Sequence, residues 1–517
     1  LDRERPHLTV SISSEVSPEA REFDRLCTTI ANAYIQPLME TYLSRFAERF
    51  AAECVTCPIL MMTAGGGMCT IQTASRFPIR LVESGPAGGA ILAARIAARA
   101  GLNEVLSFDV GGTTAKLCLI DKARPQTSRQ FEIARAARFI KGSGMPVRIP
   151  VIEMIEIGTG GGSIAGVDRL RRITVGPKSA GSEPGPVAFG RGGTEPTVTD
   201  SDITLGYIVP DTFAEGFITL EPEAAKEALA RSIGTKLGLD AVGSADGVSR
   251  IVDESMASAG RMHAVESGKD LGSRTMIAFG GNGPLHATRV ARSAGVSQIV
   301  VPPNPGVGSA IGFLFAPVSF EIVRSRYTLL KSIDMASINS LFTEMISEAK
   351  DVVSQGAGDA PTQTRRTAFM RYNGQGHEIE ITLPGRALTS QDIQPLVAFF
   401  EKEYSKQFSR PVPGMEIEIL NWAVSVATLD AERPILPETL QQNTITPTET
   451  RLITCDVDGI VKKAGYVVRA KLNPGDRIHG PALVTEPQTT TLVSADFSAH
   501  VDAIGNLVLT RDQKGDA

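Results

Sequence analysis

The chain of 517 residues has little of several features that assign a protein to a class at once. Its 6 cysteines are too few and too scattered for the disulfide framework of a small secreted protein. No run of about 18 apolar residues is present, which argues against a membrane-spanning helix. The first residues do not form a basic and apolar leader segment, so we expect a cytoplasmic protein.

The chain also has no large excess of either positive or negative charge. The chain carries 52 basic and 57 acidic residues, a formal net charge of −5, which argues against a nucleic-acid-binding surface spread over the whole chain. Hydrophobic residues make up 42% and charged residues 21%, an ordinary globular balance that excludes a mostly disordered chain. Aromatic residues are scarce at 5%, whereas 50 glycines and 31 prolines predict many tight turns between short elements.

One cysteine pair has a spacing that is used in metal and redox sites. Cys54 and Cys57 form a C-x-x-C motif, but neither a second pair nor a nearby histidine completes a zinc site. Pro58 and the apolar residues after it favour a strand, whereas a redox motif is followed by a helix. We therefore interpret these cysteines as structural.

The order of patterns along the chain predicts two domains. Residues 8–13 predict a strand, and Ser17-Pro18 predicts the start of a long helix, because serine caps helices and proline suits their first turn. From about residue 58 to 320, glycine clusters separate short apolar strands from alanine-rich helices, which is an α/β pattern.

The glycine clusters end near residue 325, where we place the domain boundary. A helical pattern over 335–355 follows, and then residues 378–383 and 416–420 alternate with a period of two, which predicts half-exposed strands. The sequence thus predicts an α/β domain over 1–325 and an α+β domain over 326–517.

The most informative segment covers residues 105–120. An apolar strand reaches Asp109, a tight turn contains two glycines and two threonines, and a second apolar strand leaves. A dinucleotide-binding or Walker loop is followed by a helix, so this turn is the tip of a β-hairpin. Glycine backbone can approach phosphate oxygens, threonine hydroxyls can donate to them, and a carboxylate can hold a hydrated Mg²⁺. The proposed phosphate-binding residues are Gly111, Gly112, Thr113 and Thr114.

Two further points concern this hairpin. Asp109 is the candidate for Mg²⁺ binding and catalysis, and Thr113 is a second catalytic candidate. Lys116 either neutralises phosphate or faces solvent on the second strand. The alternative for the whole segment is an ordinary hairpin turn.

A second glycine-rich turn strengthens the interpretation of the first as a phosphate-binding turn. Residues 276–287 predict a strand, a glycine turn and a helix that opens at Pro284 and runs to about Ala294, and residues 298–302 return as a strand. A flat glycine surface at a helix start suits a nucleoside. The proposed adenosine-side residues are Gly280, Gly281, Asn282 and Gly283. His286 lies in the first helical turn, where the helix dipole predicts a lowered pKa.

Together the two loops resemble the phosphate and adenosine loops of the superfamily of actin, sugar kinases and heat-shock chaperone ATPases. Longer motifs narrow this resemblance to the hydantoinase A/5-oxoprolinase family, and it covers nearly the whole chain. The motifs lie at residues 84–88, 157–165, 175–186, 190–200, 371–376, 475–482 and 505–509.

The resemblance implies a fold and an organisation. We expect an α/β, actin/ribonuclease-H-like ATPase core that lacks its first half, followed by an α+β domain. The family normally begins with a further domain that carries its own D-x-G-G-T loop, and this chain starts at Leu1 beyond that domain. The missing half is then a removed segment or a separate chain, and a hydantoinase B-type subunit is a further expected partner.

The resemblance also implies ATP- and Mg²⁺-dependent opening of cyclic amides such as hydantoins or 5-oxoproline, or the related carboxylation of ketones. Both activate a carbonyl oxygen by phosphoryl transfer, which relies on positioning and charge neutralisation. We interpret Gly158 to Ser163 as a backbone nest for the reacting group, with Gly161 and Ser163 as catalytic candidates. Some of these glycines should then have positive φ, and the run should face Asp109 across a cleft within about 10 Å.

Two other readings remain. A sugar-kinase-type enzyme shares both loops but does not explain the motifs over 158–200. A non-catalytic, nucleotide-binding half of a complex is the third reading. Asp200 and Asp202 either line the cleft or cap a helix.

Overall fold

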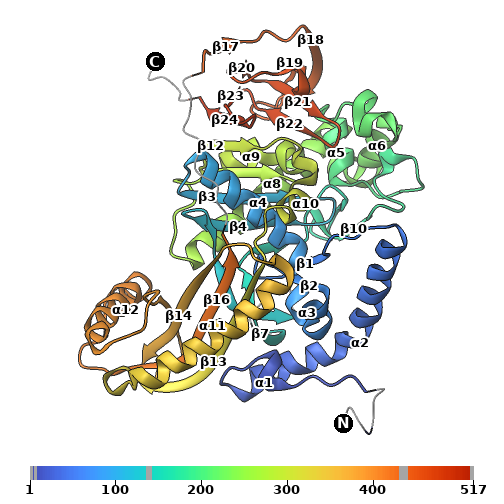
Figure 1. The fold of residues 1–517 in the computed structure, drawn as a ribbon. Coiled ribbons are helices and arrows are strands. Elements are labelled where there is room, and N and C mark those ends of the chain that lie inside the picture. Colours follow the sequence, from blue (N-terminus) through green and yellow to red (C-terminus); the bar gives the residue numbers. More distant parts are fainter. Residues whose placement is uncertain (1–3, 5–7, 135–141, 430–439, 513–517) are drawn as a thin grey trace. The chain divides into compact units, whose positions relative to one another are not determined.

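The computed structural model describes residue 4 and residues 8–134, 142–429 and 440–512 (Figure 1). The chain forms two compact units, and each is assembled from three separate segments. Unit 1 contains residues 1–87, 127–152 and 316–431, and unit 2 contains residues 88–126, 153–315 and 432–517. The units interleave along the sequence, and the consecutive division near residue 325 stays a prediction.

Unit 1 contains a long N-terminal helix and two small sheets. α2 packs on β7, α3 and α1. The elements of this part of the unit are α1 (Ser13–Val16), α2 (Glu22–Ala52), β1 (Leu60–Met62), β2 (Met68–Thr70), α3 (Ile71–Arg76), β6 (Thr127–Ile133) and β7 (Met145–Ile152). β1 pairs with β2 and β6 with β7, both antiparallel.

The rest of unit 1 is a four-stranded antiparallel sheet in the order β13-β16-β14-β15. Trp422 and Phe342 pack edge to face in its core. Its elements are β13 (Ser319–Leu329), α11 (Met335–Ala357), β14 (Thr362–Tyr372), β15 (Ile379–Thr382), α12 (Ile393–Phe408) and β16 (Ile417–Thr428). The predicted helix and the half-exposed strand at β15 are confirmed. β16 is mostly buried instead, because it lies between β13 and β14 and packs against α11.

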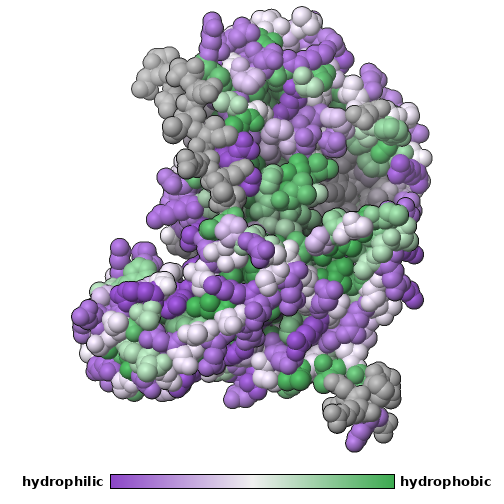
Figure 2. All heavy atoms as spheres, in the orientation of Figure 1, coloured by the Kyte–Doolittle hydropathy of each residue, from purple (hydrophilic) through white to green (hydrophobic). Residues whose placement is uncertain are grey.

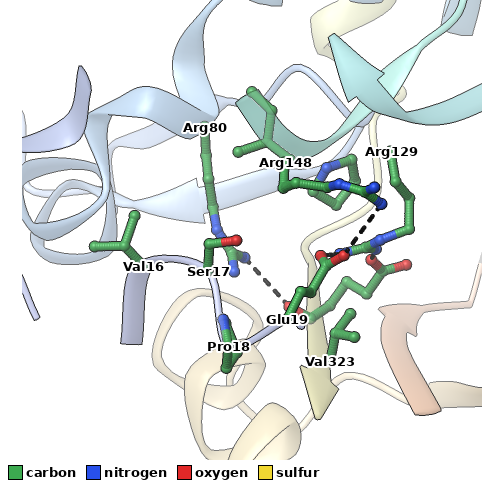
Figure 3. A pocket seen from close by; sticks show the side chains of 11 residues that line it. Val16, Ser17, Pro18, Glu19, Arg80, Arg129, Arg148 and Val323 are labelled. Atoms are coloured by element: carbon green, nitrogen blue, oxygen red, sulfur yellow. Dashed lines mark hydrogen bonds and ion pairs between the residues drawn. The ribbon is translucent and has the colours of Figure 1, made fainter. Parts of the chain in front are cut away.

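The N-terminal prediction is wrong in two places. Residues 8–12 form no strand, and α2 begins at Glu22 rather than at Ser17. Glu19 explains the difference, because its buried carboxylate pairs with Arg129 and lies 3.7 Å from Arg148 (Figure 3). These buried ion pairs fix the segment around Ser17 and Pro18, which lines a small polar pocket, and they outweigh the local capping signal.

Unit 2 is built on a ten-stranded sheet in the order β17-β20-β23-β24-β12-β11-β3-β4-β5, with β8 also paired to β4. β11 is parallel to both β3 and β12. The strands are β3 (Glu104–Val110), β4 (Ala115–Asp121), β5 (Arg124–Pro125), β8 (Ile155–Ile157), β11 (Thr275–Phe279), β12 (Gln298–Val301), β17 (Asn443–Thr444), β20 (Asp476–His479), β23 (Phe497–Val501) and β24 (Leu507–Arg511).

Helices and two smaller sheets complete this unit. α9 packs against α8, β11 and β22. The helices are α4 (Ser84–Ala100), which begins at the end of unit 1, and α5 (Val198–Thr204), α6 (Pro222–Leu229), α7 (Thr235–Leu237), α8 (Ala241–Glu266), α9 (Gly283–Ala294) and α10 (Gly308–Phe313). The strands are β9 (Ser163–Val167), β10 (Ile173–Ser179), β18 (Glu449–Thr454), β19 (Val461–Val468), β21 (Ala482–Glu486) and β22 (Thr489–Val493). Across the described residues, every helix is too short or too polar to cross a membrane.

Candidate active site

The predicted β-hairpin is confirmed, and its turn faces solvent. β3 ends at Val110 and β4 begins at Ala115, and the Gly111 N–H donates to the Thr114 carbonyl at 3.0 Å. Gly112 and Thr113 are exposed. Within the described part of the chain, their N–H groups donate no hydrogen bond. The turn therefore presents backbone donors and a hydroxyl to whatever binds there.

Asp109 is the second-last residue of β3 and pairs with Lys116 on β4. Its Oδ2 accepts a hydrogen bond from the Ser309 hydroxyl at 2.8 Å. Burial raises the pKa of Asp109, while the Ser309 hydrogen bond and the Lys116 charge act in the opposite direction. A cation beside this carboxylate would favour its charged form.

Two glycines leave room for this carboxylate. Gly280 has a φ of +87°, and a Cβ there would lie 2.6 Å from Asp109 Oδ1 and 2.4 Å from the Val110 carbonyl. A Cβ at Gly89 would lie 3.1 Å from Asp109 Oδ2 and 2.8 Å from Ser309 Oγ. Each of these Cβ atoms would have at least one contact under 3.0 Å, which is too short for a side chain. Ser309 was missed by the sequence analysis, and its only signal is its place in the glycine-rich segment 305–312.

The adenosine-side loop lies directly against the hairpin turn. Phe279, at the end of β11, pairs with Asp109 in the parallel register. The Asn282 N–H donates to the Val110 carbonyl at 2.9 Å, and its Nδ2 donates to the Gly111 carbonyl at 3.0 Å. Gly281 is exposed beside them. The structure thus brings both predicted loops together at the carboxyl ends of β3 and β11. The predicted β-α-β unit is confirmed. A nucleotide-binding role of the two loops stays a prediction.

The glycine run from Gly158 to Ser163 is buried, and the nest interpretation is wrong. The Gly161 N–H donates to the Gly111 carbonyl at 3.1 Å, and the Gly162 N–H donates to the Gly112 carbonyl at 2.6 Å. The Gly160 N–H donates to Ser163 Oγ at 2.9 Å. These donors are already used inside the protein, so they cannot form the nest that we expected.

The expected backbone conformation of this run is wrong as well, because none of its glycines has a positive φ. The run packs directly on the hairpin turn, and its placement across a cleft from Asp109 stays a prediction. A Cβ at Gly160 would lie 2.6 Å from the Gly111 carbonyl, and one at Gly161 would lie 2.4 Å from Asn282 Nδ2. The glycines therefore permit close backbone packing beneath the turn. The catalytic roles of Gly161 and Ser163 were inferred from the nest. They stay predictions, although the nest itself is not formed.

A buried cluster of charges lies behind the adenosine-side loop. His286 Nδ1 lies 2.7 Å from Asp253 Oδ1, and His286 Nε2 lies 3.4 Å from Asp202 Oδ2. Arg289, one helical turn later, pairs with Asp253 at 2.7 Å. Burial alone lowers the pKa of His286, but the two carboxylates outweigh it and raise the pKa to about 9. The expectation of a lowered pKa is wrong, because these carboxylates dominate over the helix dipole.

The two aspartates near residue 200 have different surroundings. Asp200 forms a capping box with Thr197, and its carboxylate also accepts the N–H groups of Val187 and Ala188. Helix capping is thus its role in the structure. Asp202 belongs to the buried cluster around His286. Across the described residues no group of three or more His, Cys, Asp and Glu side chains could hold a metal ion by itself.

Comparison with known proteins places this geometry in a family. The hydantoinase/oxoprolinase family model matches residues 25–322, and the hydantoinase/oxoprolinase C-terminal domain matches residues 330–510. An uncharacterized protein of Methanocaldococcus jannaschii is 33% identical over 98% of this chain and 73% of its own length. The acetophenone carboxylase gamma subunit of Aromatoleum aromaticum is 30% identical over 97% of this chain and 69% of its own length.

One solved structure is similar to this chain over nearly the whole length of the chain. The caprolactamase subunit alpha of Pseudomonas jessenii is 27% identical over 98% of this chain and 72% of its own length. The crystal structure of ATP-dependent caprolactamase from that organism covers 99% of this chain and 74% of its own, with a TM-score of 0.83 and 26% identity. The α/β architecture is therefore that of an actin-like ATPase core with a C-terminal domain. On these matches, the chain belongs to the hydantoinase/oxoprolinase family.

Proposed function

We propose that this chain is a subunit of an ATP-dependent hydrolase that opens a cyclic amide through phosphorylation of its carbonyl oxygen. One observation carries the proposal: the exposed turn after Asp109 lies against the loop from Gly280 to Gly283 at one edge of the sheet. The caprolactamase relative, which is described as ATP-dependent, supports the reaction class. The subunit names of relatives support activity as part of a complex.

The residues present fit a magnesium nucleotide. Among the described residues, a Cβ added at Gly111 or Gly112 would meet no atom within 4 Å, and one added at Gly281 would meet the Gln488 carbonyl at 3.9 Å. Asp109 is a single carboxylate, which suits Mg²⁺ because this ion keeps several waters and phosphate oxygens as ligands. Bound MgATP would supply the phosphoryl group that turns the amide oxygen into a leaving group.

The chain's own groups then have separate tasks. The N–H groups of Gly112 and Thr113 and the threonine hydroxyls would hold phosphate oxygens in place. The Asp109 carboxylate, oriented by Ser309, would hold the metal. Asn282 and the Gly158–Ser163 run fix the turn from two sides through its carbonyls. Such positioning provides much of the rate enhancement in phosphoryl transfer.

A ketone carboxylase subunit is the second candidate. The 30% identity with the acetophenone carboxylase gamma subunit favours it. Both reactions activate a carbonyl, so the residues described here serve either one. Screening a lactam, hydantoin, 5-oxoproline and small ketones for ATP-dependent consumption by the assembled complex, with and without bicarbonate, separates the two.

The central test is Asp109→Asn in the assembled complex. We expect the fold to persist, because the amide keeps the size of the carboxylate, and most ATP hydrolysis to disappear, because the metal-binding charge is gone. Asp246→Asn is the matched control, since Asp246 forms a surface pair with Arg250 on α8 and lies outside the candidate site. A loss of about tenfold or less, about 1.4 kcal/mol of barrier, would reduce Asp109 to a turn residue.

A further inference from the structure

Helix α2 in unit 1 exposes several of its large apolar side chains. Six of them recur every three or four residues and therefore share one face of the helix. We define this face as the α2 stripe: Phe23, Leu26, Ile30, Tyr34, Leu38 and Tyr42. Tyr34 is 85% exposed and Leu38 is 73% exposed. Figure 2 shows hydrophobic residues gathered over α2, at the right of the view.

The opposite face of α2 is buried and mixes apolar residues such as Ala31 and Leu43 with hydrogen-bonded polar residues. The Arg148 N–H donates to Thr28 Oγ1 at 2.8 Å, and Asn32 Nδ2 donates to the Arg76 carbonyl at 3.1 Å. The Ile79 N–H donates to Asn32 Oδ1 at 3.3 Å. These buried hydrogen bonds fix the rotation of α2, so it cannot turn its apolar side inward without leaving them unpaired.

The stripe has the size and composition of a stable interface. Six side chains of this kind, exposed by 53–85%, present about 750 Å² of surface, which is close to one side of a standard protein–protein interface. Residues 26–39 contain no charged residue, and depletion of charge marks the core of an interface. α2 as a whole carries both acidic and basic residues in balance, unlike a cationic helix that lies on a membrane.

We propose that the α2 stripe is covered by polypeptide equivalent to the part of the relatives that has no counterpart in this chain. The M. jannaschii protein and caprolactamase subunit alpha are matched over 73% and 72% of their lengths, which leaves about a quarter of each. A quarter of such a protein is the size of a small domain, and such a domain can provide an apolar face of this area. The proposal rests on the proposed function in one respect: both take activity to need this additional polypeptide.

The test uses a chimera of the whole chain with the unmatched quarter of the M. jannaschii protein, joined in the order found in that protein. Hydroxyl-radical footprinting with mass spectrometry compares Tyr34 and Tyr42 in the chimera and in the chain alone. We expect their labelling to fall several-fold in the chimera, while Tyr327, which is exposed elsewhere in unit 1, keeps its labelling. The measurement needs no nucleotide or substrate, so it stands or falls independently of catalysis.

Substitutions provide the second readout. Tyr34→Glu with Leu38→Glu should leave the melting temperature of the chain alone unchanged, because both side chains are exposed, and should lower that of the chimera. Leu170→Glu, at an exposed position in unit 2, is the control. The proposal is overturned if the chimera is no more stable than the chain alone or leaves Tyr34 labelled. It is equally overturned if the chain alone protects Tyr34 by forming a dimer, seen by sedimentation, or by binding phosphatidylglycerol vesicles.

Discussion

At the scale of residues, side chains that are far apart in sequence decide the chemistry of the candidate site. Asp109 was predictable, because a carboxylate before a glycine turn is a local pattern. Its partner Ser309 was not, since 200 positions separate them and a lone serine has no pattern. The predicted direction of the pKa shift of His286 was wrong for the same reason, because Asp202 and Asp253 come from α5 and α8. Local sequence reports the dipole of a helix but not the carboxylates that fold against it.

His286 gives a pH prediction at this scale. Its pKa is about 9 in the folded protein and about 6.5 in an unfolded chain, so the stabilisation is fully present below pH 6.5 and is lost as pH rises through 9. We expect the free energy of unfolding from denaturant titration to fall by a few kcal/mol over this range. His286→Gln should be less stable at pH 6 and should lose most of this slope.

The control for this prediction is His479→Gln, because His479 is exposed. It should keep the slope of the unsubstituted chain. If His286→Gln fails to fold at any pH, His286→Gln with Asp202→Asn removes one buried charge of each sign and should recover part of the stability. A slope that persists in the folded variants would show that His286 is neutral in the native state.

At the scale of elements, the hairpin and the β-α-β unit were predictable because strand alternation and turn chemistry agree there. The start of α2 was not, because Ser17-Pro18 is a correct local signal that the buried ion pairs of Glu19 override. The glycine run was located correctly but misinterpreted. A run of glycines permits either an anion nest or close backbone packing, and only the positions of Gly111 and Gly112 decide between them.

Gly161→Val tests that packing role. A Cβ at Gly161 would lie 2.4 Å from Asn282 Nδ2 and 2.8 Å from Thr199 Oγ1, so the larger side chain must displace the support of the turn. We expect a loss of about 1–3 kcal/mol in stability, together with parallel losses in nucleotide binding and substrate-dependent ATP hydrolysis. Gly166→Val in β9 is the matched control, since a Cβ there meets no atom of the described residues within 4 Å. Loss of hydrolysis with unchanged stability and binding would instead restore a direct catalytic role.

At the scale of the whole molecule, the fold class and the family could be predicted from long ordered motifs, whereas the interleaved units could not. Contacts that join residues 1–87 to 316–431 leave no periodic pattern in the sequence. The exposed apolar face of α2 was missed as well, because apolar residues at helical spacing predict a buried core face. Only the structure shows that the face turned inward is the one that carries Thr28, Asn32 and Leu43.

Nucleotide binding by the chain alone provides the prediction at this scale. The superfamily resemblance implies two phosphate hairpins, and the described residues provide the one that follows Asp109. We expect isothermal titration calorimetry with MgATP to give weak or undetectable binding, and the chimera to bind more tightly. A micromolar dissociation constant for the chain alone, about −8 kcal/mol, would contradict this expectation.

The order of strands in the large sheet has a consequence for synthesis on the ribosome. β24, close to the C-terminus, lies between β23 and β12, and β12 leads through β11 to β3 and the Asp109 hairpin. The sheet therefore cannot be completed until residues 507–511 have left the exit tunnel, although β3 emerges some four hundred residues earlier. Long-range pairing of this kind folds slowly and leaves strand edges open in the meantime. The nascent chain is thus expected to depend on chaperones that shield apolar segments during translation.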